Sequence, residues 1–481
     1  MSFGKLRVLL IMPDYPEFKT YGPQSDIIFP PLGLEYIAAY IRDISDVRIL
    51  DMRLKDTDIN VIKNNLKEYK PDYVGVSYNY TFQINIVLQI TRLCKEFNII
   101  TIVGGWHPTL APSDALSHES IDIIVRGEGE ITFRNILLSK KLDGILGVSF
   151  KKENQKIHNK DRDLLDLETA KLPYRNYRYK SKSDYNFLGF PIDCIETSRG
   201  CPFDCSFCCI HEFYRKRYRS RTLESIVKEL KTPIINNKAS LIFFVDDNFV
   251  VKKDFIIRLC DAIIENKIHK YFMAQARVDM IVNHPELFKK MAEAGFIFLF
   301  LGIESFSDRT LESLNKRTKF KQIKLALRIL HDYGYIIQGN VIIGANLEDK
   351  IEDLQSTIDI SKTMEIDLPT FSLLTPFPGT KLMDDIVDKG LLINTDWSNF
   401  NWATPVIDFP YLSAEDLNHY YLKAYKEVLF SKSRFRKIMQ LLLLKSPKYH
   451  LQRLLNVEIL KGLFNFLGTK FRKSNKEKYS K

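Results

Sequence analysis

Three cysteines on one short loop are the residues whose type and spacing point most directly to chemistry. Cys201, Cys205 and Cys208 form a C-x3-C-x2-C pattern within the run TSRGCPFDCSFC. Thiolates at this spacing can bind three irons of a 4Fe-4S cluster, which leaves the fourth iron open to a small molecule. An open metal position is typical of catalytic sites. The pattern therefore predicts a catalytic metal centre with these three cysteines as its ligands.

Structural zinc is the alternative interpretation of this loop. It would need a fourth ligand, for which Cys209 and His211 are the nearest candidates. Structural zinc sites usually pair two short cysteine motifs, and the chain has no second C-x2-C. The odd total of seven cysteines also disfavours a secreted disulfide framework. The remaining cysteines are isolated in apolar segments and are predicted to be buried: Cys94, Cys194 and Cys260.

An alternating series of strands and helices must position the cysteine loop. The expected strands are 192–197, 241–246, 271–275, 297–303, 336–343 and 370–374, with helical patterns at 223–231, 255–265, 287–294, 323–333 and 354–364. This order predicts a partial (β/α)6 TIM barrel over residues 190–405. The cysteines follow its first strand, at the carboxyl edge where barrel enzymes carry their active sites.

A second alternating region occupies residues 1–150. Strands are expected at 6–12, 47–51, 73–77, 99–104 and 121–126, with a helix at 32–41. This α/β order predicts a doubly wound, Rossmann-like parallel sheet. Glycine turns follow two of the strands, at Gly104-Gly105 and at Gly127-Glu128-Gly129. Such turns let a ligand approach the backbone at the carboxyl edge.

The remaining two segments are a predicted interdomain linker and a basic C-terminal region. Residues 151–189 are charged and irregular, so we expect an interdomain linker there. Residues 406–481 are expected to be a basic helical region: from Lys426 onward there are 15 lysines and arginines against 3 acidic residues, whereas the whole chain has 70 against 59. Apolar residues recur there at helical spacing, at 451, 454, 455, 459, 463, 464 and 467. This pattern fits either a membrane-interface helix or a helix packed on the barrel.

Composition limits the remaining classes. The chain of 481 residues is 45% hydrophobic and 27% charged, which is typical of globular proteins. No apolar run approaches the roughly 18 residues of a spanning helix, and the N-terminus has no cleavage-site pattern. We therefore expect a cytoplasmic protein, with peripheral contact at the inner face of the membrane through its basic end.

The cysteine loop resembles that of the radical S-adenosylmethionine (SAM) superfamily, in which an aromatic residue, here Phe207, precedes the last cysteine. Further similar segments end the later strands: FFVDDNF at 243–249, ARVD at 276–279, GIES at 302–305, GNVIIG at 339–344 and TPFPGT at 375–380. The resemblance implies that SAM chelates the open iron and yields a 5′-deoxyadenosyl radical. It also implies that Arg277 binds the methionine carboxylate, that Glu304 binds the amino group or ribose, and that Gly302 and Gly344 lie against adenine.

The first region resembles the cobalamin-binding domain fused to many radical SAM enzymes. This resemblance rests on PPLGLEYI at 30–37, PDYVGVS at 71–77, VGGWHPT at 103–109 and GEGE at 127–130. It implies that the corrin lies at the carboxyl edge and that its tail enters beside Ser77 and Gly104, with Gly105, Gly127 and Glu128 close by. The D-x-H-x-x-G loop of other cobalamin proteins is missing, and His107 is the nearest substitute ligand for cobalt.

The resemblance implies C-methylation of an unactivated carbon on a lipid or isoprenoid-like substrate. Radical cyclisation or carbon–carbon bond formation on a membrane lipid is the alternative within the same chemistry. A ferredoxin or flavodoxin is the expected electron donor. Modification of tRNA and a zinc-binding adaptor are alternatives of another class, but the chain shows neither a second cysteine set nor an RNA-binding barrel, so no nucleic-acid partner is expected.

Overall fold

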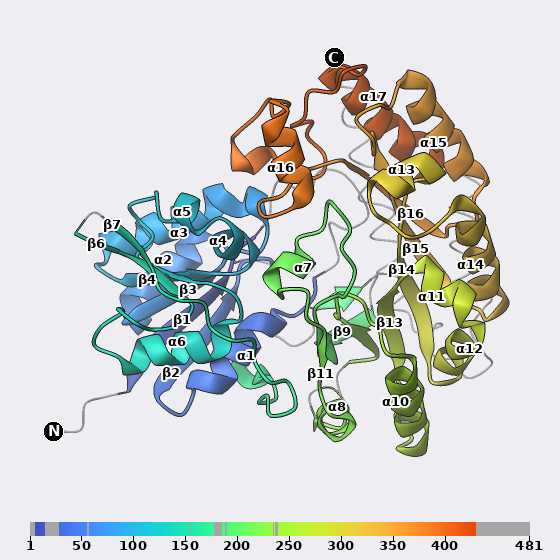
Figure 1. Ribbon diagram of the computed structural model, residues 1–481. Helices are drawn as coiled ribbons and strands as arrows, with labels where there is room; N and C mark the ends of the chain where they lie inside the picture. The colour runs from blue at the N-terminus through green and yellow to red at the C-terminus, as the bar shows by residue number, and fades with distance from the viewer. Residues whose placement is uncertain are drawn as a thin grey trace, which may run out of the picture.

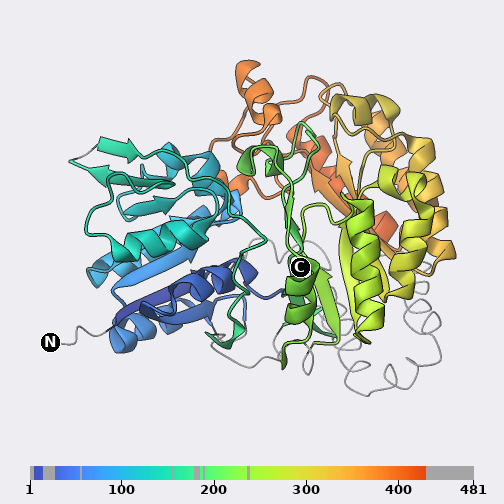
Figure 2. The ribbon, with the colours of Figure 1, turned by 60° about the horizontal axis from the view of Figure 1, so that its bottom comes forward.

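Two α/β halves lie side by side in the computed structural model (Figure 1). The structure describes residues 5–14, 28–54, 57–153, 155–177, 185–187, 190–233, 235 and 239–429. The amphipathic pattern predicted around residues 451–467 lies outside these residues. The two sheets occupy separate halves, each flanked by helices (Figure 2).

The first half is a seven-stranded sheet. Its parallel strands have the order β2-β1-β3-β4-β5 and are β1 Leu6–Met12, β2 Ser45–Asp51, β3 Tyr73–Ser77, β4 Ile100–Gly104 and β5 Ile123–Val125. Helices α1 Leu32–Ile41 and α6 Gly129–Leu138 share one apolar core on one face, and α2 Ile59–Tyr69 and α3 Ile84–Glu96 share a second core on the other. Both faces of β1 are therefore covered, which explains its continuous apolar sequence.

The segment predicted as an irregular linker begins with structure. Strands β6 Val148–Lys152 and β7 Gln155–His158 form an antiparallel hairpin that extends the first sheet past residue 150. Most β7 side chains are exposed, so the strand lacks the apolar pattern that would mark it in the sequence. Further along, Arg175 is buried and binds Asp193 and Glu229 in the second half. This segment therefore joins the two halves through buried charges as well as covalently.

The second half is a curved sheet whose strands follow sequence order. Its parallel strands are β9 Phe190–Ile195, β12 Leu241–Phe244, β13 Tyr271–Ala276, β14 Phe296–Glu304, β15 Ile336–Ile343 and β16 Leu368–Leu373, with β8 Asn186–Phe187 antiparallel at the edge. The helices include α8 Leu223–Leu230, α10 Lys253–Glu265, α11 Val278–Asn283, α12 Pro285–Glu293, α13 Asp308–Ser313, α14 Phe320–Asp332 and α15 Ile351–Thr363. This arrangement confirms the predicted combination of a Rossmann-like sheet with a partial barrel.

Short elements at the carboxyl edges complete the fold. After β3 and β4 come η3 Thr81–Gln83, α4 Trp106–Leu110 and α5 Pro112–Ala115; the cysteine loop holds α7 Ile210–Phe213 between β10 Ser198–Arg199 and β11 Arg219–Ser220. After β16 come α16 Lys381–Asp388, η5 Trp397–Asn399, α17 Ala414–Ala424 and η6 Tyr425–Leu429. Figure 1 shows α16 at the top of the molecule, between the halves. There, Trp397 of η5 packs against His107 of the first half.

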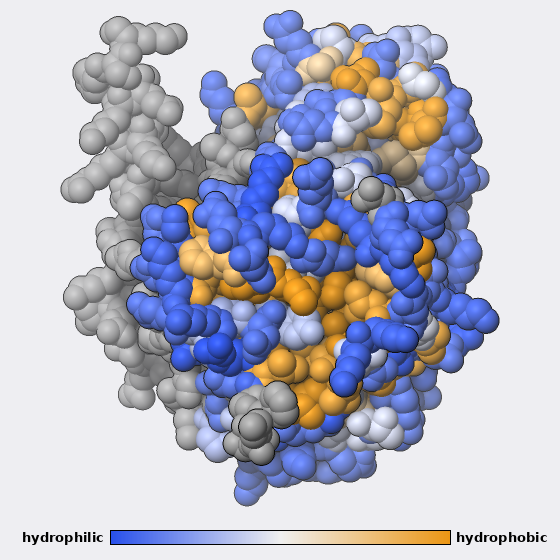
Figure 3. All heavy atoms as spheres, turned by 90° about the vertical axis from the view of Figure 1, so that its left-hand side faces the viewer, coloured by the Kyte–Doolittle hydropathy of each residue, from blue (hydrophilic) through white to orange (hydrophobic). Residues whose placement is uncertain are grey.

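The outer face of the first half is covered mainly by hydrophilic side chains, with hydrophobic residues visible between them (Figure 3). Within the described part of the chain, no helix has the length and hydropathy needed to cross a membrane.

Candidate functional site

The cysteine loop lies at the carboxyl end of β9. All three motif cysteines are free thiols, with Cys205 buried and the other two partly exposed. Burial raises the pKa of Cys208 well above its ordinary value and that of Cys209 to about 11. A metal that binds Cys208 must therefore displace its proton. Among the described residues, no group of three or more His, Cys, Asp or Glu side chains is arranged around a single metal ion, whereas the thiols of a 4Fe-4S cluster each bind a different iron.

Two aspartates at the end of β12 hold the start of the cysteine loop. Asp246 accepts hydrogen bonds from the Thr197 backbone N–H at 3.1 Å and from the hydroxyls of Thr197 and Ser198. Asp247 accepts one from the Gly200 backbone N–H at 2.9 Å. Both carboxylates are desolvated, and burial raises the pKa of Asp247 to about 6. They act as anchors of the loop rather than as solvated acids.

Arg277, at the end of β13, faces the cysteine loop. Its guanidinium lies 3.6 Å from the centre of the Phe203 ring, and Nη1 is 4.0 Å from Sγ of Cys205. Asp279 binds the same guanidinium through Nε and Nη2, at 2.9 and 3.0 Å. Arg277 therefore lies next to the cysteine loop, but its guanidinium already binds the carboxylate of Asp279.

Glu304, at the end of β14, is half of a buried ion pair that the sequence did not predict. Its Oε1 lies 2.7 Å from Nζ of Lys316, which also lies 5.9 Å from the centre of the Phe207 ring. Burial alone would lower the pKa of Lys316, but Glu304 and Cys205 raise it above the usual range. Glu304 has φ +63°, a strained conformation for a residue other than glycine. Such strain is common at functional sites.

The two glycines predicted to face adenine are enclosed by side chains. A Cβ on Gly302 would lie 2.5 Å from Oε1 of Glu304 and from Nζ of Lys316, so a side chain there would have to displace the ends of this ion pair. Gly344 has φ +67°, and its Cβ would lie 2.8 Å from Leu417 of α17. Helix α17 therefore covers the face of Gly344 that a Cβ would occupy. The sequence could not show this, since α17 begins 70 residues later.

The concave side of the barrel encloses a cavity of about 590 Å³ that reaches the cysteine loop. Phe207, Cys208 and Glu304 line one part of it. Many of the remaining lining residues are aromatic: Phe29, Tyr80, Phe82, Phe187, Phe243, Phe300, Phe371, Phe377, Trp402, Tyr421 and Tyr425. Others are polar and uncharged: Gln275, Gln338, Asn340, Thr370, Ser372, Thr375 and Asn401. Tyr80 and Phe82 come from the first half, and both lie 5.8 Å from Trp402, ring centre to ring centre. The first half thus supplies one wall of the barrel cavity.

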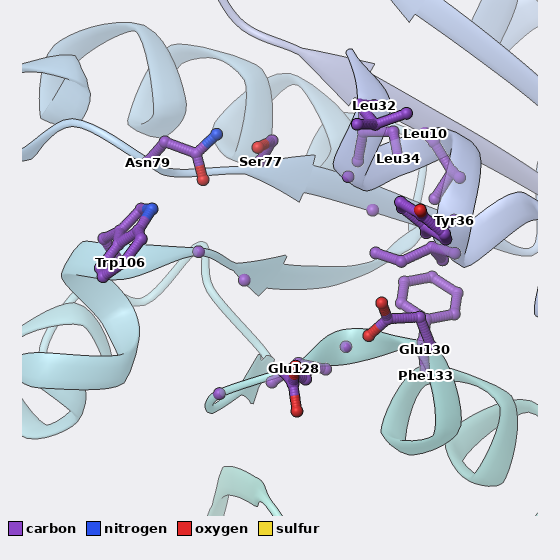
Figure 4. Close-up of a pocket in the computed structure, with 18 of the residues that line it drawn as sticks. Leu10, Leu32, Leu34, Tyr36, Ser77, Asn79, Trp106, Glu128, Glu130 and Phe133 are labelled. Atoms are coloured by element: carbon purple, nitrogen blue, oxygen red, sulfur yellow. The ribbon is translucent and has the colours of Figure 1, made fainter. Parts of the chain in front are cut away.

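A second pocket, of about 260 Å³, lies at the carboxyl edge of the first sheet, next to the point where the strand order reverses between β1 and β3. Open α/β sheets bind ligands at this point. Ser77, Gly104, Gly105, Gly127 and Glu128 all line the pocket, so the structure brings these predicted residues together. Figure 4 shows Ser77, Asn79 and Trp106 at one end, and Tyr36, Phe133 and apolar side chains at the other.

His107 is the predicted pocket residue that the structure places elsewhere. Its side chain is fully buried, with Nδ1 3.3 Å from Thr81 and Nε2 3.3 Å from Asp114. The ring stacks on Tyr78 at 4.5 Å and meets Trp397 at 5.3 Å. Both nitrogens therefore have partners within the protein, and the ring does not line the pocket, so the structure does not bring His107 together with the other predicted residues.

Buried charges line the pocket where it meets the cysteine loop. Arg199 binds Glu128 at 2.8 Å, Glu130 at 2.7 Å and Glu196 at 2.8 Å. Although burial would raise the pKa of Glu128, Arg199 and Arg219 hold it below its usual range. Burial raises the pKa of Glu196 to about 7 despite its bond to Arg199. Glu128 is thus ion-paired with two arginines of the protein. The sequence of the glycine-rich turn did not predict these partners.

Comparison with known families assigns the two halves. The Radical SAM superfamily matches residues 195–359, and the B12 binding domain matches residues 24–137. The first match covers the cysteine loop and the strands from β10 to β15. The second covers β2 to β5 and the glycine turns that line the pocket, but not β1.

Three curated relatives extend these matches over most of the chain. An uncharacterised methyltransferase of Pyrococcus horikoshii is 31% identical over 87% of this chain and 92% of its own. An anaerobic magnesium-protoporphyrin IX monomethyl ester cyclase of Rubrivivax gelatinosus is 26% identical over 84% and 73%. The hopanoid C-3 methylase of Methylococcus capsulatus is 29% identical over 73% and 67%.

A solved structure has the same arrangement of domains. The cobalamin-dependent SAM radical enzyme OxsB, with aqua-cobalamin and SAM bound, has a TM-score of 0.70 and 19% identity over 96% of this chain and 72% of that one. At this identity the similarity shows the fold. Together with the sequence relatives, it identifies the class of protein: an enzyme with a corrinoid-binding sheet and a radical SAM barrel.

The chain belongs to the cobalamin-binding radical SAM family of methyltransferases and cyclases. This confirms the predicted enzyme and its cofactors: a 4Fe-4S cluster, SAM and cobalamin. The donor set fits them, since Cys208 lines the barrel cavity, Cys201 and Cys205 are free thiols on the same loop, and a pocket of suitable position lies beside the first sheet. Lys316 and Arg199, which local sequence did not mark, are the main additions from the structure.

Proposed function

We propose that this protein methylates an unactivated carbon of an uncharged, largely apolar substrate, such as a lipid or isoprenoid. When bound, the cluster and SAM supply a radical that removes a hydrogen atom, and cobalamin carries the methyl group. Cys201, Cys205 and Cys208 would hold the cluster, with Phe207, Arg277 and Glu304 beside SAM. Ser77, Gly104, Gly105 and Gly127 would border the corrinoid.

The lining of the barrel cavity is the observation that carries this proposal. None of its described residues is a lysine, arginine or histidine. Its acidic residue, Glu304, is already paired with Lys316. A phosphate or carboxylate buried there would lack a cationic partner, which is costly in an apolar environment. The aromatic walls instead favour burial of apolar surface.

Uncharged polar residues also line this cavity, two glutamines among them: Gln275, Gln338, Asn340, Thr370, Ser372, Thr375 and Asn401. Gln275 and Gln338 line it, and both pair in register with Phe300, one strand away on either side. Their amides can donate and accept hydrogen bonds without carrying charge. They suit a single hydroxyl or carbonyl on an otherwise apolar molecule, because an unpaired amide in an apolar site is unfavourable.

Labelled methyl transfer tests the substrate class. Reconstituted enzyme with cobalamin, a reductant and CD3-labelled SAM would be incubated with neutral-lipid, acidic-lipid and tetrapyrrole fractions. We expect CD3 in a neutral lipid, and its loss when Gln338 is replaced by Glu, which would bury a carboxylate. Label confined to the acidic or tetrapyrrole fraction would overturn the proposed substrate. A dehydrogenated or ring-closed product without CD3 would instead establish cyclisation, the reaction in the name of the Rubrivivax relative.

We further propose a cytoplasmic location with peripheral membrane contact through residues 430–481. The excess of basic residues after Lys426 supports this, because such segments bind anionic lipid surfaces. A ferredoxin or flavodoxin would reduce the cluster. Sedimentation with phosphatidylglycerol vesicles should fall on truncation at residue 430 and in high salt. Unchanged sedimentation of the truncated chain would refute the contact.

A further inference from the structure

The cysteine loop is closed at its base by a two-stranded ribbon. Strand β10 ends two residues before Cys201, and β11 follows the loop; Arg199 pairs with Arg219 across this antiparallel ribbon. Both arginines bind one carboxylate, Glu128. Arg199 does so at 2.8 Å, and Arg219 contacts both oxygens at 3.0 Å. A single side chain therefore holds both ends of the loop.

Glu128 belongs to the other half of the molecule. It lies in the turn between β5 and α6, and this turn lines the pocket of the first sheet (Figure 4). Its side chain is 6% exposed. Because Glu128 is buried and binds both arginines, its removal would take the carboxylate partner from Arg219 and one of three from Arg199. The position of the turn and the position of the loop are thus strongly tied.

A second contact joins the same pocket to the same loop. Trp106 follows the Gly104-Gly105 turn and lines the pocket. Its ring lies 4.2 Å from Phe213 of α7 and 5.7 Å from Tyr214, centre to centre. Aromatic contacts of this kind hold their partners in a defined orientation. Two turns that would touch a ligand of the first sheet therefore also touch the cysteine loop.

We infer that Glu128, Arg199 and Arg219 are positioning residues that couple the two cofactor sites, so that corrinoid in the first pocket and iron on the cysteine loop each strengthen the binding of the other. The inference rests on the proposed function, in which both groups are bound. A ligand in the pocket fixes the turns, and the turns hold the loop ends in place for the cysteines. Such coupling is reciprocal: both affinities change by the same factor.

Binding of hydroxocobalamin to iron-loaded and iron-free protein tests this. Dissociation constants would be measured by absorbance under anaerobic conditions, and the binding of iron with and without hydroxocobalamin would provide the reciprocal measurement. We expect about tenfold tighter corrinoid binding in the iron-loaded wild type, within the usual range of coupling. In Arg219→Gln the factor should fall below about twofold. Arg219 does not line the pocket, so its direct effect on the corrinoid is small.

The ratio of the two dissociation constants separates coupling from general destabilisation. A purely structural effect would weaken binding equally with and without iron and leave the ratio unchanged. Asp43→Asn is the matched control, since it removes a carboxylate that binds Arg134 through two bonds, at 2.6 and 2.8 Å, on the same half. It should keep the wild-type ratio. Glu128→Gln should lower the ratio as Arg219→Gln does. If the Arg219→Gln protein does not fold, Glu128→Gln takes its place in the experiment.

Three results would count against the inference. A wild-type ratio near one would refute the coupling while leaving cobalamin-dependent function intact. If Arg219→Gln and Glu128→Gln both keep the wild-type ratio, these side chains do not transmit the coupling between the two sites. Failure of hydroxocobalamin to bind either form would overturn the proposed function, and this inference with it.

Discussion

The pocket of the first sheet has a volume of about 260 Å³, and the cavity of the barrel about 590 Å³. The first is shaped by backbone turns, of which Gly105 and Gly127 have positive φ. The second is shaped by side chains: aromatic residues, uncharged polar residues, Cys208, and Glu304, which is paired with Lys316. The pocket therefore depends on close approach to backbone, whereas the barrel site depends on particular functional groups.

This difference shows how one chain can bind two large cofactors next to each other. Backbone turns accept a broad, flat group through shape, because glycine leaves the chain accessible. Thiols and buried ions hold a metal and a charged nucleoside through specific bonds. The two regions should therefore respond to different kinds of substitution, and the following experiments test that separation.

The largest effect is expected for Cys205→Ala. Removing one of three thiolates should reduce iron from about four per chain to almost none and abolish activity, because the protein supplies only three ligands. Iron analysis after anaerobic reconstitution measures this. Cys260→Ala, a buried cysteine of the barrel core, should keep its iron. Saturating hydroxocobalamin should still bind the Cys205 variant; complete loss would mean that the two regions are not separable.

Lys316→Met should destabilise the barrel by about 3 kcal/mol or more, because it leaves Glu304 buried without its partner. Urea unfolding measures the loss, and the double variant Lys316→Met with Glu304→Gln should recover part of it. Lys381→Met breaks an exposed pair with Asp385 and should cost less than about 1 kcal/mol. Similar losses in both single variants would show that the buried pair has no special role.

Gly105→Ala should damage the first pocket and spare the barrel. Gly105 has φ +124°, and a Cβ there would lie 2.5 Å from the carbonyl oxygen of Tyr78. Such strain costs on the order of 1–3 kcal/mol, so corrinoid affinity should fall by about tenfold or more while iron content stays normal. Gly33→Ala is the control, because Gly33 also lines the pocket but has open space around its Cβ position. Normal corrinoid affinity in Gly105→Ala would refute the shape argument.

The smallest effect concerns Glu196, between the two regions. Its pKa is raised by burial from 4.5 to about 7, so the folded protein binds an extra proton between these pH values. The free energy of unfolding should therefore fall as pH rises from about 4.5 to 7, by roughly 2 kcal/mol or less. Glu196→Gln should remove this contribution, as urea unfolding of the iron-free protein at several pH values would show. If the free energy of unfolding of Glu196→Gln keeps the wild-type pH dependence, another group titrates in this range.

Local sequence was sufficient to predict much of the fold. The bounds of β1, β3, β15 and α1 agree with the predicted ranges, because continuous apolar runs and helical periodicity are local signals. The hairpin β6–β7 was not predicted, since its exposed edge strand carries no apolar pattern. The pocket glycines could be predicted because a glycine turn directly after a strand is also a local pattern, which spans only a few residues of sequence.

The cysteine spacing and the order of strands and helices by themselves determined the family, the metal ligands that we propose and the two-part architecture. Only the tertiary structure decided that Glu128 binds Arg199 and Arg219, that Lys316 neutralises Glu304, and that His107 is enclosed by Tyr78 and Trp397. Glu128 is 71 and 91 residues from its two arginines. Pairing of charges buried from water depends on which surfaces meet when the two halves pack, and no local pattern records that.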